Sequence, residues 1–170
     1  YQTSGKGQKI ALIDSGIDLG HIAFQKNMDG SEKVVTYRDY TEEGLLHSQA
    51  VSCHGNRIAA NGNIYRIDSS KDKAFAYRIA FLDLETLQPR RFLEAKQQLA
   101  ILLVATKNKY DHIYIDTNQN FDFSDEAPIY CYQAKAQTII LHNAGYDLNI
   151  ALTDIAEDGT QLHLTADTLG

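Results

Sequence analysis

The chain has only two cysteines, Cys53 and Cys131, among its 170 residues. A disulfide framework needs more, and their spacing suits no zinc site, so the two either pair or stay free, and free thiols are favoured. Long apolar runs are also missing. The longest, Leu99 to Ala105, is far shorter than the ~20 residues of a membrane-spanning helix. The sequence therefore predicts no membrane span.

Positive charge is scarce as well. Sixteen Lys and Arg residues face 22 Asp and Glu residues, which gives a net charge of -6 and a pI near 5.4. This balance argues against a nucleic-acid partner. What is present is ordinary for a globular chain: 44% hydrophobic and 22% charged residues, in a length that can bury one sizeable core.

One apolar stretch runs directly into polar turn-formers near the start of the chain. Ile10 to Ile13 is followed by Asp14, Ser15 and Gly16. A short apolar run with such a boundary predicts a strand buried on both faces, as in parallel sheets. Asp14 would lie at the carboxyl end of that strand, where open α/β sheets place catalytic groups. We expect its carboxylate to be paired, because a lone buried charge is costly.

Most of the remaining chain has the character of short strands joined by tight turns. Asn61-Gly62 is the strongest hairpin signal, and Glu157-Asp158-Gly159 predicts a second hairpin. Only Arg91 to Gln98 favours a helix. The predicted class is α/β: the first strand of a parallel sheet, then a mostly antiparallel β-rich insertion. Predicted strands cover residues 34–37, 50–53, 56–60, 63–67, 74–84, 99–106, 112–116, 129–133, 138–142, 146–154 and 161–165.

A polar loop after the strand at 112–116 alternates oxygen-bearing side chains. This spacing resembles an EF-hand-like calcium loop, whose hard cation takes six to eight oxygen ligands. The loop departs from that pattern at Phe121, where glycine is required, and at Ala127, where the bidentate Glu belongs. The alternative is a connection closed by Asx turns. The candidate calcium ligands are Asp116, Asn118, Asn120, Asp122 and Ser124, with Glu126 in the same phase.

Residues 9–18 resemble the segment around the catalytic aspartate of the subtilisin-like serine proteases, the subtilases. Gly5-Lys6-Gly7 agrees with the Gly-x-Gly that usually precedes that segment, and His21 and Phe24 agree with the His-Pro-x-Phe that often follows it. The resemblance implies that Asp14 is the acid of a Ser-His-Asp triad, which orients the imidazole and stabilises the imidazolium.

A second segment, Cys53 to Ala60, resembles the subtilase histidine motif at His54, Gly55, Ile58 and Ala59. In that family the motif continues into a helix, whereas here Asn61-Gly62 ends the segment. His54 is therefore an alternative triad base. The favoured interpretation is that His54 is a histidine on a hairpin strand without a catalytic role.

The tail resembles the long-insertion, tripeptidyl-peptidase-II-like group of subtilases, in which similar strands lead directly to the catalytic histidine. The segments that carry this resemblance are 147–150, 157–162 and 165–170. It implies three parts: 1–40 begins the catalytic domain, 41–160 is a β-rich insertion, and 161–170 is a return strand leading to a catalytic-histidine segment beyond this chain.

The resemblance implies the amino-terminal part of a peptidase that acts on peptides or proteins. Its partner is the remainder of the catalytic domain, which carries the His and Ser, so this chain alone is expected to be inactive. No cofactor is required for catalysis, calcium remains possible, and a bacterial-type secreted or periplasmic location is favoured over the cytoplasm.

Two alternatives remain open. The chain could be a non-catalytic β-rich binding or architectural module, with or without calcium at 116–126. It could also be a retropepsin-like aspartic peptidase, because Asp-Ser-Gly after an apolar strand opens that active site too. Two copies of Asp14 would then share a proton across a dimer, although the chain is long for that fold.

Overall fold

Regular structure in this protein is almost entirely β. The computed structural model describes residues 7–14, 17–19, 21–38, 40, 42, 44–72, 74, 76–84, 98–135, 137–143 and 146–169. Its described helices, α1 (Ile22–Gln25) and α2 (Ser69–Asp72), are single turns. The strands are β1 (Leu45–His47), β2 (Gln49–Val51), β3 (Cys53–His54), β4 (Arg57–Ala60), β5 (Asn63–Arg66), β6 (Ala76–Asp83), β7 (Gln98–Thr106), β8 (Lys109–Ile115), β9 (Ile129–Tyr130), β10 (Ile139–Asn143), β11 (Tyr146–Ile155) and β12 (Gln161–Leu169).

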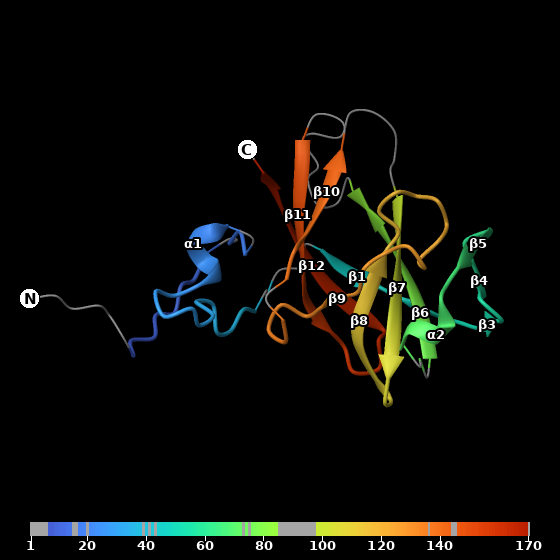
Figure 1. Ribbon diagram of the computed structural model, residues 1–170, viewed down its shortest axis with the longest axis horizontal. Coiled ribbons are helices and arrows are strands. Elements are labelled where there is room, and N and C mark those ends of the chain that lie inside the picture. Colours follow the sequence, from blue (N-terminus) through green and yellow to red (C-terminus); the bar gives the residue numbers. More distant parts are fainter. Residues whose placement is uncertain are drawn as a thin grey trace, which may run out of the picture.

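These strands form three sheets, which Figure 1 shows as successive parts of one β structure. A four-stranded sheet has the order β1-β12-β11-β10, a five-stranded sheet has the order β2-β6-β7-β8-β9, and β3-β4-β5 form a small third sheet. The two predicted hairpins are confirmed. Asn61 and Gly62 take φ of 49° and 77° between β4 and β5, as a two-residue hairpin turn requires. Gly159 turns the chain between β11 and β12 with φ of 69°.

The predicted α/β class with a parallel sheet is wrong. Every pairing between named strands is antiparallel. The physical reason is that parallel neighbours need long crossover connections, whereas tight turns join the pairs β3–β4, β4–β5, β7–β8 and β11–β12 here. Residues 8–14 form no strand, and Ile10 and Ile13 are 89% and 98% exposed, so the expected burial of this segment is also wrong. Residues 34–37 form no strand either. Of the helix expected at 91–98, residues 91–97 lie outside the described residues, and Gln98 is the first residue of β7.

Strand β7 is the centre of the core because both of its faces are covered. Leu99, Ile101 and Leu103 belong to one apolar cluster, together with Leu148 and Leu164 of the four-stranded sheet. The alternate residues of β7 belong to a second cluster with the small third sheet and the 116–126 loop: Ala100, Leu102 and Val104 with Ile58, Tyr65, Ile67 and Phe123. The five-stranded sheet is therefore the middle of three β layers, and its central strand is a continuous apolar run.

A glycine at the β11–β12 turn allows the two large sheets to meet closely. A Cβ at position 159 would lie 2.6 Å from Tyr110 Cδ2 and 2.8 Å from Arg78 Cδ. The Gly159 carbonyl accepts a hydrogen bond from Ser48 Oγ. The Arg78 guanidinium donates to Ser48 Oγ over 2.7 Å and to the Ser48 carbonyl over 2.8 Å. These hydrogen bonds connect β6 of the five-stranded sheet to the β11–β12 turn of the four-stranded sheet.

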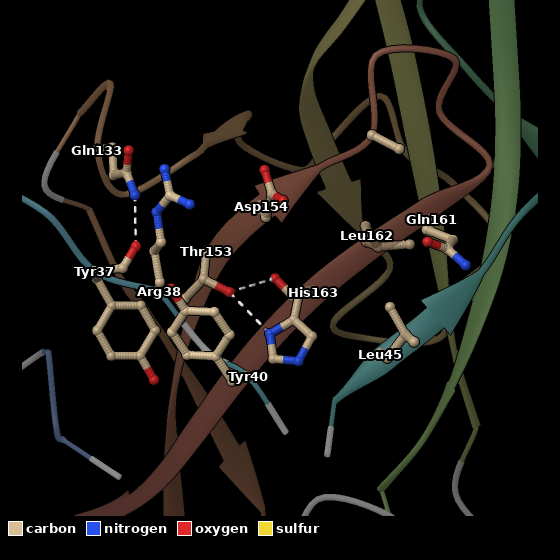
Figure 2. A pocket seen from close by; sticks show the side chains of 11 residues that line it. Tyr37, Arg38, Tyr40, Leu45, Gln133, Thr153, Asp154, Gln161, Leu162 and His163 are labelled. Atoms are coloured by element: carbon tan, nitrogen blue, oxygen red, sulfur yellow. Dashed lines mark hydrogen bonds between the residues drawn. The ribbon is translucent and has the colours of Figure 1, made fainter. Parts of the chain in front are cut away.

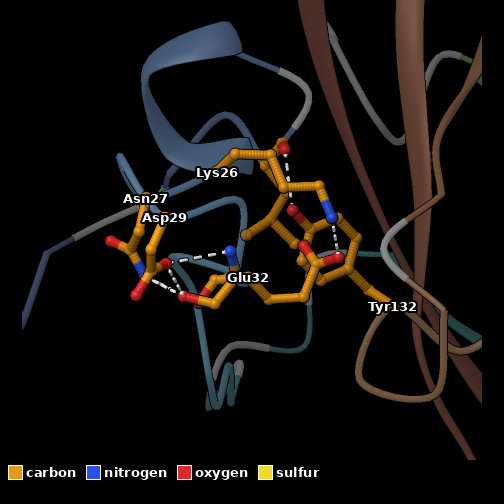
Figure 3. A network of polar contacts seen from close by, with 7 residues as sticks. Lys26, Asn27, Asp29, Glu32 and Tyr132 are labelled. Carbon is orange, nitrogen blue, oxygen red and sulfur yellow. Dashed lines mark hydrogen bonds and ion pairs between the residues drawn. The ribbon is translucent and has the colours of Figure 1, made fainter.

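Part of the amino-terminal segment packs against the four-stranded sheet. Leu19 and Tyr132 are buried together with Ala151 of β11. Tyr132 Oη donates to the Leu19 carbonyl over 3.1 Å, and burial is the main cause that raises the pKa of this phenol. Figure 3 shows Tyr132 beside the Lys26–Glu32 ion pair, which closes the loop after α1. The segment is thus held by a small apolar cluster and a few polar contacts.

Two expectations from composition can be compared directly with the structure. Cys53 and Cys131 are free thiols, as favoured from the sequence, and burial raises the pKa of the Cys131 thiol. Within the described residues, no helix is long and apolar enough to cross a membrane.

Candidate functional site

Asp14 lies at the end of segment 8–14, which has no regular secondary structure, and it is exposed. Leu12 and Ile13, which precede it, are exposed as well. The carboxylate therefore does not have the buried setting expected from the sequence. A triad aspartate works by holding an imidazole in one tautomer and orientation, which requires packing around the carboxylate. The described residues of this chain do not provide that packing at Asp14.

His54 lies far from this segment. It ends β3, is exposed, and pairs in the antiparallel register with Arg57 of β4. Figure 1 shows β3 at one end of the molecule and the amino-terminal segment at the other end. The structure therefore does not bring Asp14 and His54 together, and His54 occupies the hairpin position that the Asn61-Gly62 turn indicated.

The 116–126 loop uses its alternating oxygens as hydrogen-bond acceptors. The two carboxylate oxygens of Asp116 accept from the backbone N–H groups of Asn120 (3.1 Å) and Phe121 (3.0 Å). Asn120 Oδ1 accepts from Asp122 N over 2.8 Å, and Asp122 Oδ1 accepts from Ser124 N over 2.8 Å. The last two bonds, from the acceptors Asn120 and Asp122 to the N–H two residues on, are the Asx turns that formed the alternative to a metal site. In the described part of the chain, no group of three His, Cys, Asp or Glu side chains is placed to hold a metal ion.

Asp116 is the centre of this loop. Its side chain is buried, and desolvation is the main cause that raises its pKa, against the lowering effect of the backbone N–H groups it accepts from. Those hydrogen bonds hold Phe121 at a φ of 63°, in the left-handed region that side chains rarely adopt. The loop is therefore closed by one buried carboxylate.

Replacing Asp116 with alanine should lower the free energy of unfolding by about 2–4 kcal/mol, because two hydrogen bonds to a charged group are lost and the Phe121 N–H loses its side-chain acceptor. The matched control is Asn118→Ala, which removes an exposed acceptor from the same Asn120 N–H and should cost under about 1 kcal/mol. Urea denaturation measures both changes, and equal losses would contradict the central role of Asp116.

Calcium at this loop stays a prediction. Melting temperatures of the same proteins with calcium and with chelator test it, because a bound metal raises the melting temperature.

A pocket of about 500 Å³ lies between residues 37–45 and the β11–β12 hairpin (Figure 2). Thr153 is the extra residue of a β-bulge in β11, since Leu152 pairs with Leu164 and Asp154 pairs with His163. Bulges redirect side chains, and this one places Thr153 beside His163. The pocket is lined by Tyr37, Arg38, Tyr40, Leu45, Gln133, Thr153, Asp154, Ala156, Gln161, Leu162 and His163.

The hydrogen bonds of Thr153 assign the tautomer of His163. The hydroxyl donates to the His163 carbonyl over 3.0 Å and lies 3.1 Å from His163 Nδ1. Since a hydroxyl has one proton to donate, we assign it as the acceptor from His163 Nδ1–H. With Arg38, Asp154 and two phenols nearby, the pocket suits a small polar ligand. The sequence analysis did not find this pocket, because no local signal marks a bulge at Thr153.

Comparisons with known proteins add one relative. The chain is 23% identical to pyrolysin of Pyrococcus furiosus over 184 aligned residues, which include 91% of this chain and 13% of pyrolysin. This chain therefore spans only a small part of the length of that relative. No protein-family model matches the chain, and no solved structure matches it. The distant similarity to pyrolysin supports a relationship of this chain to the subtilisin-like proteases.

Proposed function

We propose that this chain is the amino-terminal part of the catalytic region of a subtilisin-like serine peptidase, of the tripeptidyl-peptidase-II-like group with a long insertion. In this proposal Asp14 is the triad aspartate, and the histidine and serine belong to a later part of the same polypeptide. The observation that carries it is the similarity to pyrolysin, which extends over nearly all of this chain but a small fraction of pyrolysin. Peptides or proteins are the proposed substrates.

The exposed segment before Asp14 supports this role. Ile10 and Ile13 are almost fully exposed, and an apolar surface of this kind marks a site of contact with another part of the protein. When the remainder of the catalytic region covers this segment, Asp14 gains the dry, packed surroundings that a triad aspartate uses. In this proposal the base and the oxyanion site for serine attack belong to that remainder, so this chain is inactive alone.

The topology supports the proposed division into 1–40, 41–160 and 161–170. β1, near the start of the proposed insertion, pairs with β12, which forms the proposed return strand directly after the insertion, with Leu45 opposite His163 and His47 opposite Gln161. Ends that lie side by side are typical of a domain inserted into a host chain, because the host needs no large rearrangement to accept it. The β layers then form a unit between two parts of the catalytic region.

The test compares the complete gene product with the 170-residue chain. We expect the complete protein to cleave casein and to react covalently with a fluorophosphonate probe, since an activated serine attacks such phosphorus centres. The chain alone should do neither. Casein cleavage by the chain alone, or cleavage by the complete protein that pepstatin blocks and the fluorophosphonate does not, would overturn the proposal, and the second result would favour the aspartic-peptidase alternative.

A further inference from the structure

The outer face of the small third sheet carries a row of nitrogen-bearing side chains. His54 of β3 pairs with Arg57 of β4, and Arg57 pairs with Arg66 of β5. Directly paired residues point to the same face of a sheet, and neighbouring strands are about 4.8 Å apart. The three side chains therefore cross the sheet in one line about 10 Å long. Figure 1 shows this sheet at the end of the molecule.

The row is exposed and only partly neutralised. His54, Arg57 and Arg66 all lie at the surface. Arg66 forms an ion pair with Asp122 at 3.5 Å and is still 68% exposed, whereas Arg57 makes no ion pair within the described part of the chain. Like charges placed directly opposite each other destabilise a strand pair. Hairpin stability therefore does not explain two opposed arginines, and they stand out on a chain whose net charge is -6.

An apolar pair lies next to this row on the same face. Ala59 and Ile64 are paired two residues along from Arg57 and Arg66, and Ile64 is 61% exposed. Two residues along a strand span about 6.8 Å, which is also the distance between side chains i and i+2 of an extended peptide. The inner face of the hairpin is fixed by the buried residues Ile58 and Tyr65, so the outer face is a rigid surface.

We propose that this face binds an extended acidic peptide segment that runs along the strands, with a carboxylate on the Arg57–Arg66 pair and an apolar side chain, two residues along, on Ile64. Arginine suits this task because its guanidinium holds a carboxylate through two parallel hydrogen bonds. The overall negative charge of the chain opposes a long polyanion such as nucleic acid more strongly than a short peptide with few charges. This binding is independent of any proteolytic activity.

The test uses the complete protein and a short fluorescein-labelled peptide that contains Glu-Ser-Leu. Fluorescence anisotropy gives the Kd, and Arg57→Gln should raise it at least about tenfold, since a hydrogen bond to a charged group contributes that much. Lys33→Gln is the control, because Lys33 is an exposed cation beside α1, at the other end of the molecule from this sheet, and the Kd should not change. Peptide with serine in place of leucine should bind several-fold more weakly. Circular dichroism confirms that both variants fold.

Two results would overturn the proposal. One is a Kd for the peptide that is the same in wild type and in Arg57→Gln, including the case in which neither binds. The other is an Arg57-dependent affinity for a short single-stranded DNA that exceeds the affinity for the peptide, which would assign the face to nucleic acid instead.

Discussion

Under the proposed function, replacement of Asp14 by asparagine in the complete protein should lower kcat for peptide cleavage about 10⁴-fold, with a much smaller change in KM. An asparagine keeps the shape of the side chain but presents an amide to the imidazole, so the base is held in the wrong tautomer and its protonated form loses the neighbouring negative charge. Substrate binding uses other surfaces, so the loss falls on the chemical step. Steady-state kinetics on a peptide substrate measure both parameters.

Asp18→Asn is the matched control. Asp18 lies four residues further along, and its carboxylate accepts a hydrogen bond from Asn149 of β11 over 3.1 Å. That contact attaches the amino-terminal segment to the four-stranded sheet, so its loss should change stability by about 1 kcal/mol and leave kcat nearly unchanged. If Asp14→Asn kept full activity, or if both variants lost the same fraction of kcat, Asp14 would not be the triad acid.

Truncation of Leu103 to alanine should lower the free energy of unfolding by about 3–5 kcal/mol. Leu103 has 0% exposure at the middle of β7 and belongs to the cluster between the two large sheets. The loss combines the transfer of the missing methyl groups with the cavity that the surrounding sheets cannot fill. Chemical denaturation of the folded protein gives the change directly.

Two further truncations serve as comparisons for the stability loss in Leu103→Ala. Leu102→Ala removes a buried side chain from the opposite face of β7, in the second cluster, and should cost a similar amount if both faces of the middle sheet are packed. Ile64→Ala removes an apolar side chain that is mostly exposed and should cost less than about 0.5 kcal/mol. A small loss in Leu102→Ala would mean that the third layer contributes little to the stability of the fold.

Local turn chemistry made much of the β structure predictable. Asn61-Gly62 and Glu157-Asp158-Gly159 mark hairpins because their backbone conformations are specific to a few residue types. Their flanking strands lie close to the predicted positions. The pairing of β1 with β12 has no such signal, since its residues are distant in sequence and meet only in the folded sheet.

Burial was the part that the sequence could not decide. Ile10 to Ile13 and Leu99 to Ala105 are both short apolar runs, and both fit a strand covered on two faces. Only the second is buried, because layers of β structure pack on each side of β7. Likewise, the alternating oxygens of the 116–126 loop fit a cation or a series of Asx turns. The structure has the turns, whereas the role of Asp14 stays a prediction.

The exposed segment 8–14 also bears on how this polypeptide behaves on its own. Ile10 to Ile13 contains no charge and no proline, and within the described residues it pairs with no strand. Segments of this kind are templates for strand pairing between copies, the route by which proteins aggregate. A chain made without whatever covers this segment should therefore self-associate as its concentration rises. The solubility of the chain would then depend on whether another part of the protein covers this segment, and not on the stability of the β layers.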